Sequence, residues 1–139
     1  MKSSMFAFLI VSTLLFIAAA SAAEPPRLKS GLWEIRLQAP AYHAAPMIGC
    51  VGAMSDQQRQ VEQANIKKKC SKYESRELGG KWVVEMVCAA GGHTLTQRVT
   101  TSLVGDSFHE ENSGSQGSNT SDGKWLGACK PGQKPTIFK

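Results

Sequence analysis

Hydrophobic and polar residues alternate along several short stretches of the chain, which is the pattern of β-strands that bury one face. Between residues 32 and 37, Trp33, Ile35 and Leu37 fall on one face, and charged side chains fall on the other. Similar stretches predict further strands over residues 47–51, 70–77, 82–88, 94–104, 108–111 and 125–129. Short strands at this spacing indicate a mainly β domain.

One segment lacks this alternation and predicts a short surface helix. Ser55 and Gln58 have the spacing of a capping box, in which each side chain hydrogen-bonds the backbone N–H of the other residue. Residues 56–66 are mostly polar and should form the helix. The lysines at 67–69 follow it, and cations are favoured at a helix C-terminus.

Three segments are expected to lack regular structure. Residues 112–123 consist almost entirely of Gly, Ser, Asn, Thr and Gln, so they cannot bury enough surface to order themselves and should form a flexible loop. Residues 39–46 contain two prolines and should form another loop. Residues 130–139 also contain two prolines, and we expect a frayed tail there.

The first residues of the chain predict a secretory signal. Lys2 precedes an apolar run that extends from Met5 to Ala20, and the small residues Ser21, Ala22 and Ala23 follow. We expect residues 1–23 to be removed after Ala22 or Ala23, leaving residues 24–139 as one domain that is periplasmic or secreted. An uncleaved membrane anchor is the alternative, because the run approaches the length that spans a bilayer.

All four cysteines, Cys50, Cys70, Cys88 and Cys129, follow the predicted signal. An even number in a small exported domain indicates disulfides, whereas a zinc site requires closely spaced ligand pairs. A turn centred on Gly79 lies midway between Cys70 and Cys88, so a hairpin there places them opposite each other at bridging distance. By elimination, Cys50 pairs with Cys129.

The charge and the motifs of the chain exclude several classes of function. Without Lys2, 15 basic and 11 acidic residues remain, and the basic ones are scattered and lack interleaved aromatic residues, so we expect no nucleic-acid binding. The three histidines lie far apart, and no metalloprotease or serine-hydrolase motif is present. We therefore expect no enzyme, no cofactor and no metal; a copper site at His43, Met47 and Met54 is a weaker alternative.

Three motifs carry a family resemblance. The chain contains RLKSGLWE at residues 27–34, a cysteine (Cys50) shortly before the predicted helix, and GKWLGAC at residues 123–129. Together they resemble domain-of-unknown-function family 3617, which consists of small exported bacterial proteins. The resemblance implies an exported fold but no activity. Because family members have a longer strand region before the last cysteine, residues 112–123 imply a missing or disordered strand.

These observations predict a single curved antiparallel sheet or a partly open barrel, with one short α-helix and two disulfides. We expect a non-enzymatic binding module that presents an edge strand or residues 39–46 to an envelope protein. The alternative is a carrier of a small apolar or envelope-derived ligand, which Trp33, Trp82, Phe108 and Trp125 could contact, although core packing is their commoner role. In the predicted hairpin, Arg76 lies opposite Trp82 as a cation–π pair.

Overall fold

The computed structural model describes residues 24–138, and the predicted signal peptide over residues 1–23 lies outside them. The described chain is mostly β-sheet with one helix, as the alternating pattern predicted. The elements in chain order are β1 (Gly31–Ala39), β2 (Tyr42–His43), β3 (Met47–Gly52), α1 (Asp56–Lys69), β4 (Cys70–Leu78), β5 (Lys81–Ala90), β6 (His93–Val104), β7 (Ser107–Gly114), β8 (Gly117–Gly127) and β9 (Ile137–Phe138).

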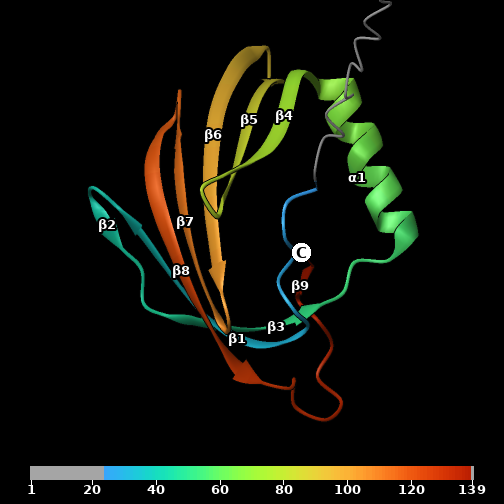
Figure 1. Cartoon of the computed structure of the whole chain (residues 1–139), viewed down its shortest axis with the longest axis vertical. Coiled ribbons are helices and arrows are strands. Elements are labelled where there is room, and N and C mark those ends of the chain that lie inside the picture. Colours follow the sequence, from blue (N-terminus) through green and yellow to red (C-terminus); the bar gives the residue numbers. More distant parts are fainter. Residues whose placement is uncertain (1–23, 139) are drawn as a thin grey trace, which may run out of the picture.

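The strands form one open sheet in the order β4-β5-β6-β7-β8-β1-β3-β9, and β2 pairs with β1. All pairings are antiparallel except that of β3 with β9. Figure 1 shows the sheet as a curved wall, with α1 standing across from its concave side. Of the two expected architectures, the structure therefore has the open curved sheet rather than a barrel.

The expectation of a loop over residues 112–123 is wrong. These residues form the end of β7, a tight turn and most of β8, with Asn112 opposite Asn119 and Gly114 opposite Gly117. A central strand receives hydrogen bonds from both neighbours, so small polar residues can form it without burying much surface of their own. The strand that the resemblance implied to be missing is therefore present as β8.

The expected loop and tail also contain short pairings. Tyr42 and His43 fold back on the end of β1, so residues 39–46 form a small hairpin rather than only a loop. Ile137 and Phe138 pair in parallel with β3, and the N–H of Thr136 donates to the carbonyl of Cys50. The tail is thus attached to the sheet at its end, contrary to the expected fraying.

The helix begins as predicted and ends later. Ser55 accepts from the N–H of Gln58, and the Gln58 side chain accepts from the N–H of Ser55, which confirms the capping box. The helix continues through the lysines to Lys69, where the N–H of Cys70 donates to the carbonyl of Ile66. The basic run is therefore the last turn of α1, where it complements the helix dipole.

Both predicted disulfides are confirmed. Cys70 lies opposite Cys88 across the β4–β5 hairpin, and Cys50 is bonded to Cys129. The rest of the hairpin differs from the prediction by one position, because a bulge between Cys70 and Lys72 shifts the register. Trp82 consequently faces Glu77 instead of Arg76, and the expected cation–π pair is wrong.

The hydrophobic core is small. Its buried cluster consists of Trp33, Val51 and Phe108, and the rings of Trp33 and Phe108 lie 5.7 Å apart. The partly buried side chains packed against this cluster are Leu28, Ile35, Leu103 and Trp125. This core covers one end of the concave face and leaves the rest of that face for other contacts.

Candidate functional site

A groove of about 470 Å³ lies on the concave face, between the sheet, α1 and the N-terminal residues 24–28. This volume is within the range of small-molecule sites, about 300–1,000 Å³. The sheet contributes Val84, Met86, Gln97, Val99, Thr101, Phe108, Glu110 and Asn112 to its wall. The groove is therefore built mainly on strands β5, β6 and β7 in the middle of the sheet.

The floor of the groove combines apolar and amide side chains. Directly opposed residues of antiparallel strands point to the same face. Val84 lies opposite Val99, and Val99 lies opposite Asn112. One step along the strands, Met86 lies opposite Gln97. An apolar surface interrupted by a few polar groups is typical of sites that hold small ligands.

Residues 24–28, which we call the strap, form one side of the groove. Leu28 packs against the core, and Arg27 pairs with Glu24 and donates to the sulfur of Met54 at 3.6 Å. Beyond the strap is a second hollow of about 550 Å³, which shares Glu24 as a lining residue with the groove. The strap thus divides the space between α1 and the sheet.

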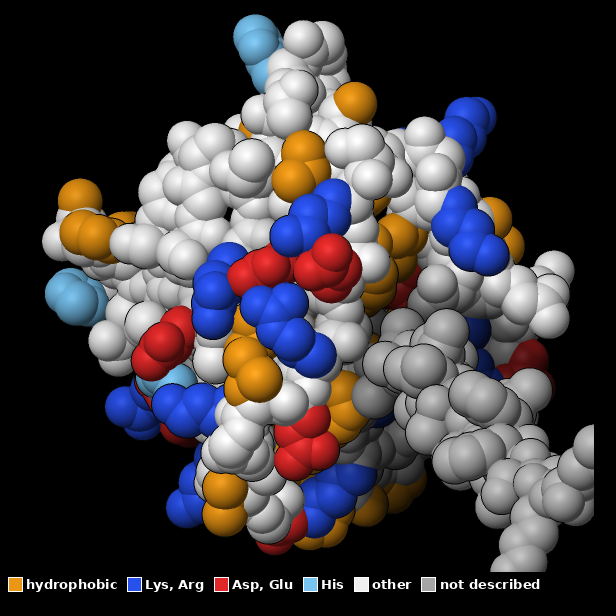
Figure 2. All heavy atoms as spheres, turned by 45° about the horizontal axis from the view of Figure 1, so that its top comes forward, with side chains coloured by type: hydrophobic (Ala, Val, Ile, Leu, Met, Phe, Trp, Pro, Cys, Tyr) orange, Lys and Arg blue, Asp and Glu red, His pale blue; other side chains and the backbone are white. Residues whose placement is uncertain are grey.

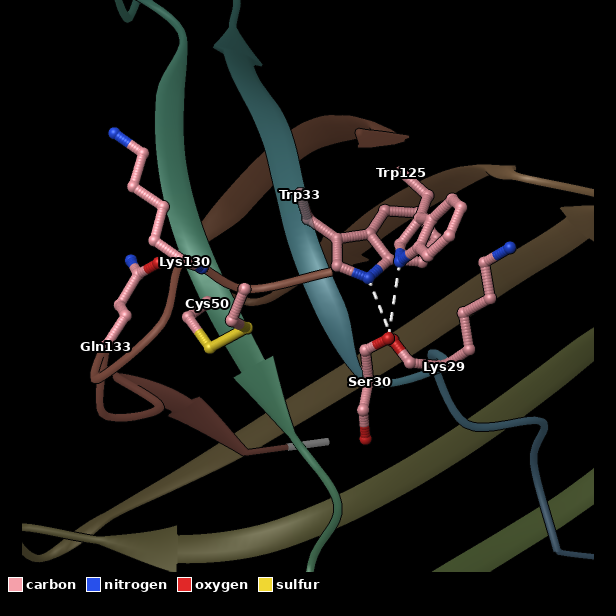
Figure 3. The surroundings of a disulfide bond; sticks show 8 residues. Lys29, Ser30, Trp33, Cys50, Trp125, Lys130 and Gln133 are labelled. Carbon is pink, nitrogen blue, oxygen red and sulfur yellow. Dashed lines mark hydrogen bonds between the residues drawn. A yellow bond between two sulfur atoms is a disulfide. The ribbon is translucent and has the colours of Figure 1, made fainter. Parts of the chain in front are cut away.

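The strap is anchored where it enters β1. The indole N–H of Trp33 donates to the carbonyl of Lys29 at 2.9 Å, and that of Trp125 donates to the carbonyl of Ser30 at 3.3 Å (Figure 3). Gly31 has φ +142°, and a Cβ there would lie 2.1 Å from the indole nitrogen of Trp125. The close approach of the Trp125 ring therefore requires glycine at this position.

The carboxylates of Glu24 and Glu62 line the groove together with Tyr73. Burial raises the pKa of Tyr73, and the charges of Glu62 and Glu24 add to this effect. The hydrogen bond from Arg27 lowers the pKa of Glu24. The guanidinium of Arg27 is therefore already paired with the carboxylate of Glu24, another residue of the strap.

Polar groups of the floor are paired with each other. The hydroxyl of Thr101 donates to Glu110 at 3.4 Å, and the amide nitrogen of Gln97 donates to the amide oxygen of Asn112 at 2.7 Å. In contrast, the Ser75 hydroxyl is buried and has no hydrogen-bond partner among the residues described. Ser75 lies opposite Val84 and lines the second hollow, so this unsatisfied group is on the same face.

The opposite, convex face of the sheet carries acidic and basic side chains that pair with one another. Glu85 accepts from Lys72 at 3.2 Å, from Arg76 at 3.1 Å and from Arg98 at 2.9 Å. Figure 2 shows acidic and basic side chains interleaved on the surface rather than a patch of one sign. Such exposed pairs contribute little binding energy of their own, and they do not form a field that attracts a charged partner.

His109 lies on this convex face with two carboxylates. Its Nδ1 is 2.7 Å from Asp122, and its Nε2 is 3.4 Å from Glu111. The hydrogen bond to Asp122 raises the pKa of His109. Because the strand partners of His109 are Ser102 and Asp122, this group points away from the groove and takes no part in it.

The four aromatic residues considered as contacts lie in different surroundings. Trp33 is fully buried in the core, and Trp125 packs against that core while its N–H holds the strap. Trp82 is half-buried on β5 between Glu77 and Thr101. Of the four, Phe108 alone lines the groove.

The residues of the alternative copper site are separated by the fold. His43 lies in β2 at a hollow on the convex face, whereas Met54 lies in the groove beside Arg27. Within residues 24–138, no group of three or more His, Cys, Asp or Glu side chains could hold a metal ion. In the same residues, no helix is long and apolar enough to cross a membrane.

The strap and the amide pair were missed by sequence reasoning. Alternation had placed Val84 and Met86 on one face of a strand, and Val99 on one face of the next. It gave no indication that this face stays only partly covered. The available signal was the pair Pro25-Pro26, which favours an extended segment without backbone donors directly after the predicted signal.

The two disulfides indicate an oxidising compartment, because such bonds rarely persist in the cytosol. No curated protein and no solved structure matches the chain. One family model matches residues 28–129, and this range contains the Gly-Leu-Trp-Glu motif and all four cysteines. The chain therefore belongs to the family described as protein of unknown function (DUF3617).

Proposed function

We propose that this protein is an exported, non-enzymatic binding module that holds a small apolar ligand in the concave groove. The observation that carries the proposal is a groove of about 470 Å³ whose floor is formed by Val84, Val99 and Phe108. A soluble domain gains stability by covering such a surface, so a surface left open on the concave side favours a binding role. Export is supported by the two disulfides and by the sequence of residues 1–23.

The contacts of three ionisable side chains at the groove support binding rather than catalysis. Arg27 is paired with Glu24, and Glu110 accepts from Thr101. A general acid or base must be free to exchange a proton with the substrate. These side chains are instead held in an ion pair and a hydrogen bond with other residues that line the groove.

Binding through an exposed edge strand is less well supported. The open sheet has an edge at each end, the two-residue β9 beside β3 at one end and the nine-residue β4 at the other, and the longer edge strand carries the charged residues Lys72, Glu74, Arg76 and Glu77. Charges on an edge strand oppose the pairing of another chain. The concave groove is therefore the better candidate.

The test is titration of the oxidised protein, residues 24–139, with the uncharged fluorescent probe N-phenyl-1-naphthylamine. We expect saturable binding of one probe per chain. The variant Val99→Trp fills the floor of the groove and should abolish that binding. Thr100→Trp adds the same side chain at the next residue, which faces the opposite side of the sheet, and should leave the affinity unchanged.

Two results would contradict the proposal. One is the absence of saturable binding by the folded wild-type protein. The other is equal binding by Val99→Trp and Thr100→Trp, which would place the probe elsewhere. A cooperative urea-unfolding transition in each variant establishes that the variant is folded.

A further inference from the structure

The two amide side chains on the floor of the groove restrict the chemistry of its ligand. The amide nitrogen of Gln97 on β6 donates to the amide oxygen of Asn112 on β7 at 2.7 Å. Both residues line the groove, where Met86 lies opposite Gln97 and Val99 lies opposite Asn112. A polar pair is therefore set directly beside the apolar floor.

The pair leaves the Gln97 carbonyl acceptor and N–H donors available side by side. A primary amide has two N–H donors and one carbonyl acceptor. After the mutual hydrogen bond, Asn112 retains its N–H groups and Gln97 retains its carbonyl oxygen, and no other side-chain partner of either is found within residues 24–138. A ligand primary amide has an N–H on the same side as its carbonyl oxygen, so it has the complementary arrangement, whereas a secondary amide is trans and points the two groups in opposite directions. Turning both side-chain amides over exchanges their roles and leaves the same complement.

The charges of the groove disfavour an anionic head group. Glu24, Glu62 and Glu110 line it, and Arg27 is the cation among its described lining residues. Arg27 is already paired with Glu24. A ligand carboxylate would thus approach like charges without an available partner, whereas an uncharged amide avoids this cost.

We propose that the groove holds ligands that combine an apolar chain with a primary amide, in preference to ligands that carry a carboxylate. The amide N–H of the ligand donates to Gln97, its carbonyl accepts from Asn112, and its chain lies along Val84 and Val99 and past the Thr101–Glu110 pair toward Phe108. This inference rests on the proposed function and adds the class of ligand to it.

The test compares three ligands with the same chain by isothermal titration calorimetry, below their micelle concentrations. They are octanamide, octanoate and octylammonium. The amide should bind the oxidised protein at least about tenfold more tightly than octanoate, since two hydrogen bonds together contribute roughly this factor. Asn112→Leu should lower the affinity for the amide about tenfold and leave that for octylammonium, which has no carbonyl acceptor, unchanged.

Two further variants make the comparison specific. Asn112→Asp retains the size of the side chain and removes both N–H donors, so it should also lower the affinity for the amide. Asn119→Leu is the matched control, because Asn119 lies opposite Asn112 on β8 but outside the groove lining. It should bind all three ligands as the wild-type protein does.

The outcomes separate this inference from the proposed function. Equal affinities for the amide and octanoate, tighter binding of octanoate, or an unchanged amide affinity in Asn112→Asp would overturn the amide selectivity while the binding role stands. If the folded protein binds none of the three ligands and no N-phenyl-1-naphthylamine, the proposed function itself fails.

Discussion

Gly123 lies beneath the core ring of Phe108, and its replacement by alanine should destabilise the domain. Phe108 is opposite Gly123 in the β7–β8 pairing. A Cβ at position 123 would lie 1.9 Å from the ring carbon Cε1 of Phe108, whereas ordinary contact begins at 3.4 Å. The ring would have to move by that difference, toward Trp33, which is fully buried.

The magnitude follows from two opposing effects. Overpacking a well-packed core costs about 1–3 kcal/mol, and alanine gains about 0.5–1 kcal/mol over glycine in a strand. We expect Gly123→Ala to lower the free energy of unfolding by about 1–2 kcal/mol. In urea this corresponds to a decrease of about 1 M in the unfolding midpoint.

The assay is equilibrium urea unfolding of the oxidised protein. Ser121→Ala is the control, because Ser121 is two residues away on the same face of β8, and it should change the stability by less than about 0.5 kcal/mol. In the background Phe108→Leu the cost of Gly123→Ala should decrease by about 1 kcal/mol, since the ring is gone. An unchanged midpoint in Gly123→Ala would refute the reasoning.

Three other predictions concern stability, measured by the same unfolding assay. Replacing both cysteines of the Cys50–Cys129 bridge by alanine should cost about 4 kcal/mol, against about 3 kcal/mol for the Cys70–Cys88 bridge, because the first closes the longer loop; equal costs would contradict this. Since Asp122 raises the pKa of His109 in the folded state, stability from this pair should be full below the unfolded pKa of about 6.5 and be lost as the pH rises through the folded value. His109→Gln should remove that pH dependence between about pH 6 and 8, and a retained dependence would assign it to another group. Ser75→Ala should be neutral or slightly stabilising, because the buried hydroxyl has no partner among the described residues; a loss above about 1 kcal/mol would show that it has one.

The elements that depend on local pattern were predictable from the sequence. The alternation of Trp33, Ile35 and Leu37 identified β1, because a strand has a side-chain period of two. Ser55 and Gln58 located the start of α1 through their own hydrogen bonds. The cysteine pairing was predictable because a tight turn fixes which residues of a hairpin face each other.

Features that depend on distant partners were not predictable in this way. The composition of residues 112–123 indicates a loop, and only the neighbouring strands β1 and β6 make a central position available to them. The path of the strap depends on contacts with residues far along the chain, such as the pairing of Lys29, the residue directly after the strap, with Asp106. Alternation assigns Val99 to a face but contains no information about what covers that face.

The strand order also has a consequence for the time course of folding. Strands β4 to β8 follow one another in the sheet as they do in the chain, so each can join its predecessor as soon as it exists. β1, in contrast, has its long partner in β8, and Cys50 must wait for Cys129. Because the N-terminal part of the chain is synthesised first, Trp33 and the Cys50 thiol remain uncovered until β8 and Cys129, near the end of the sequence, have been synthesised. During this interval Cys70 is the cysteine nearest to Cys50 in the sequence, so the order of the cysteines along the chain does not by itself favour the native bond between Cys50 and Cys129.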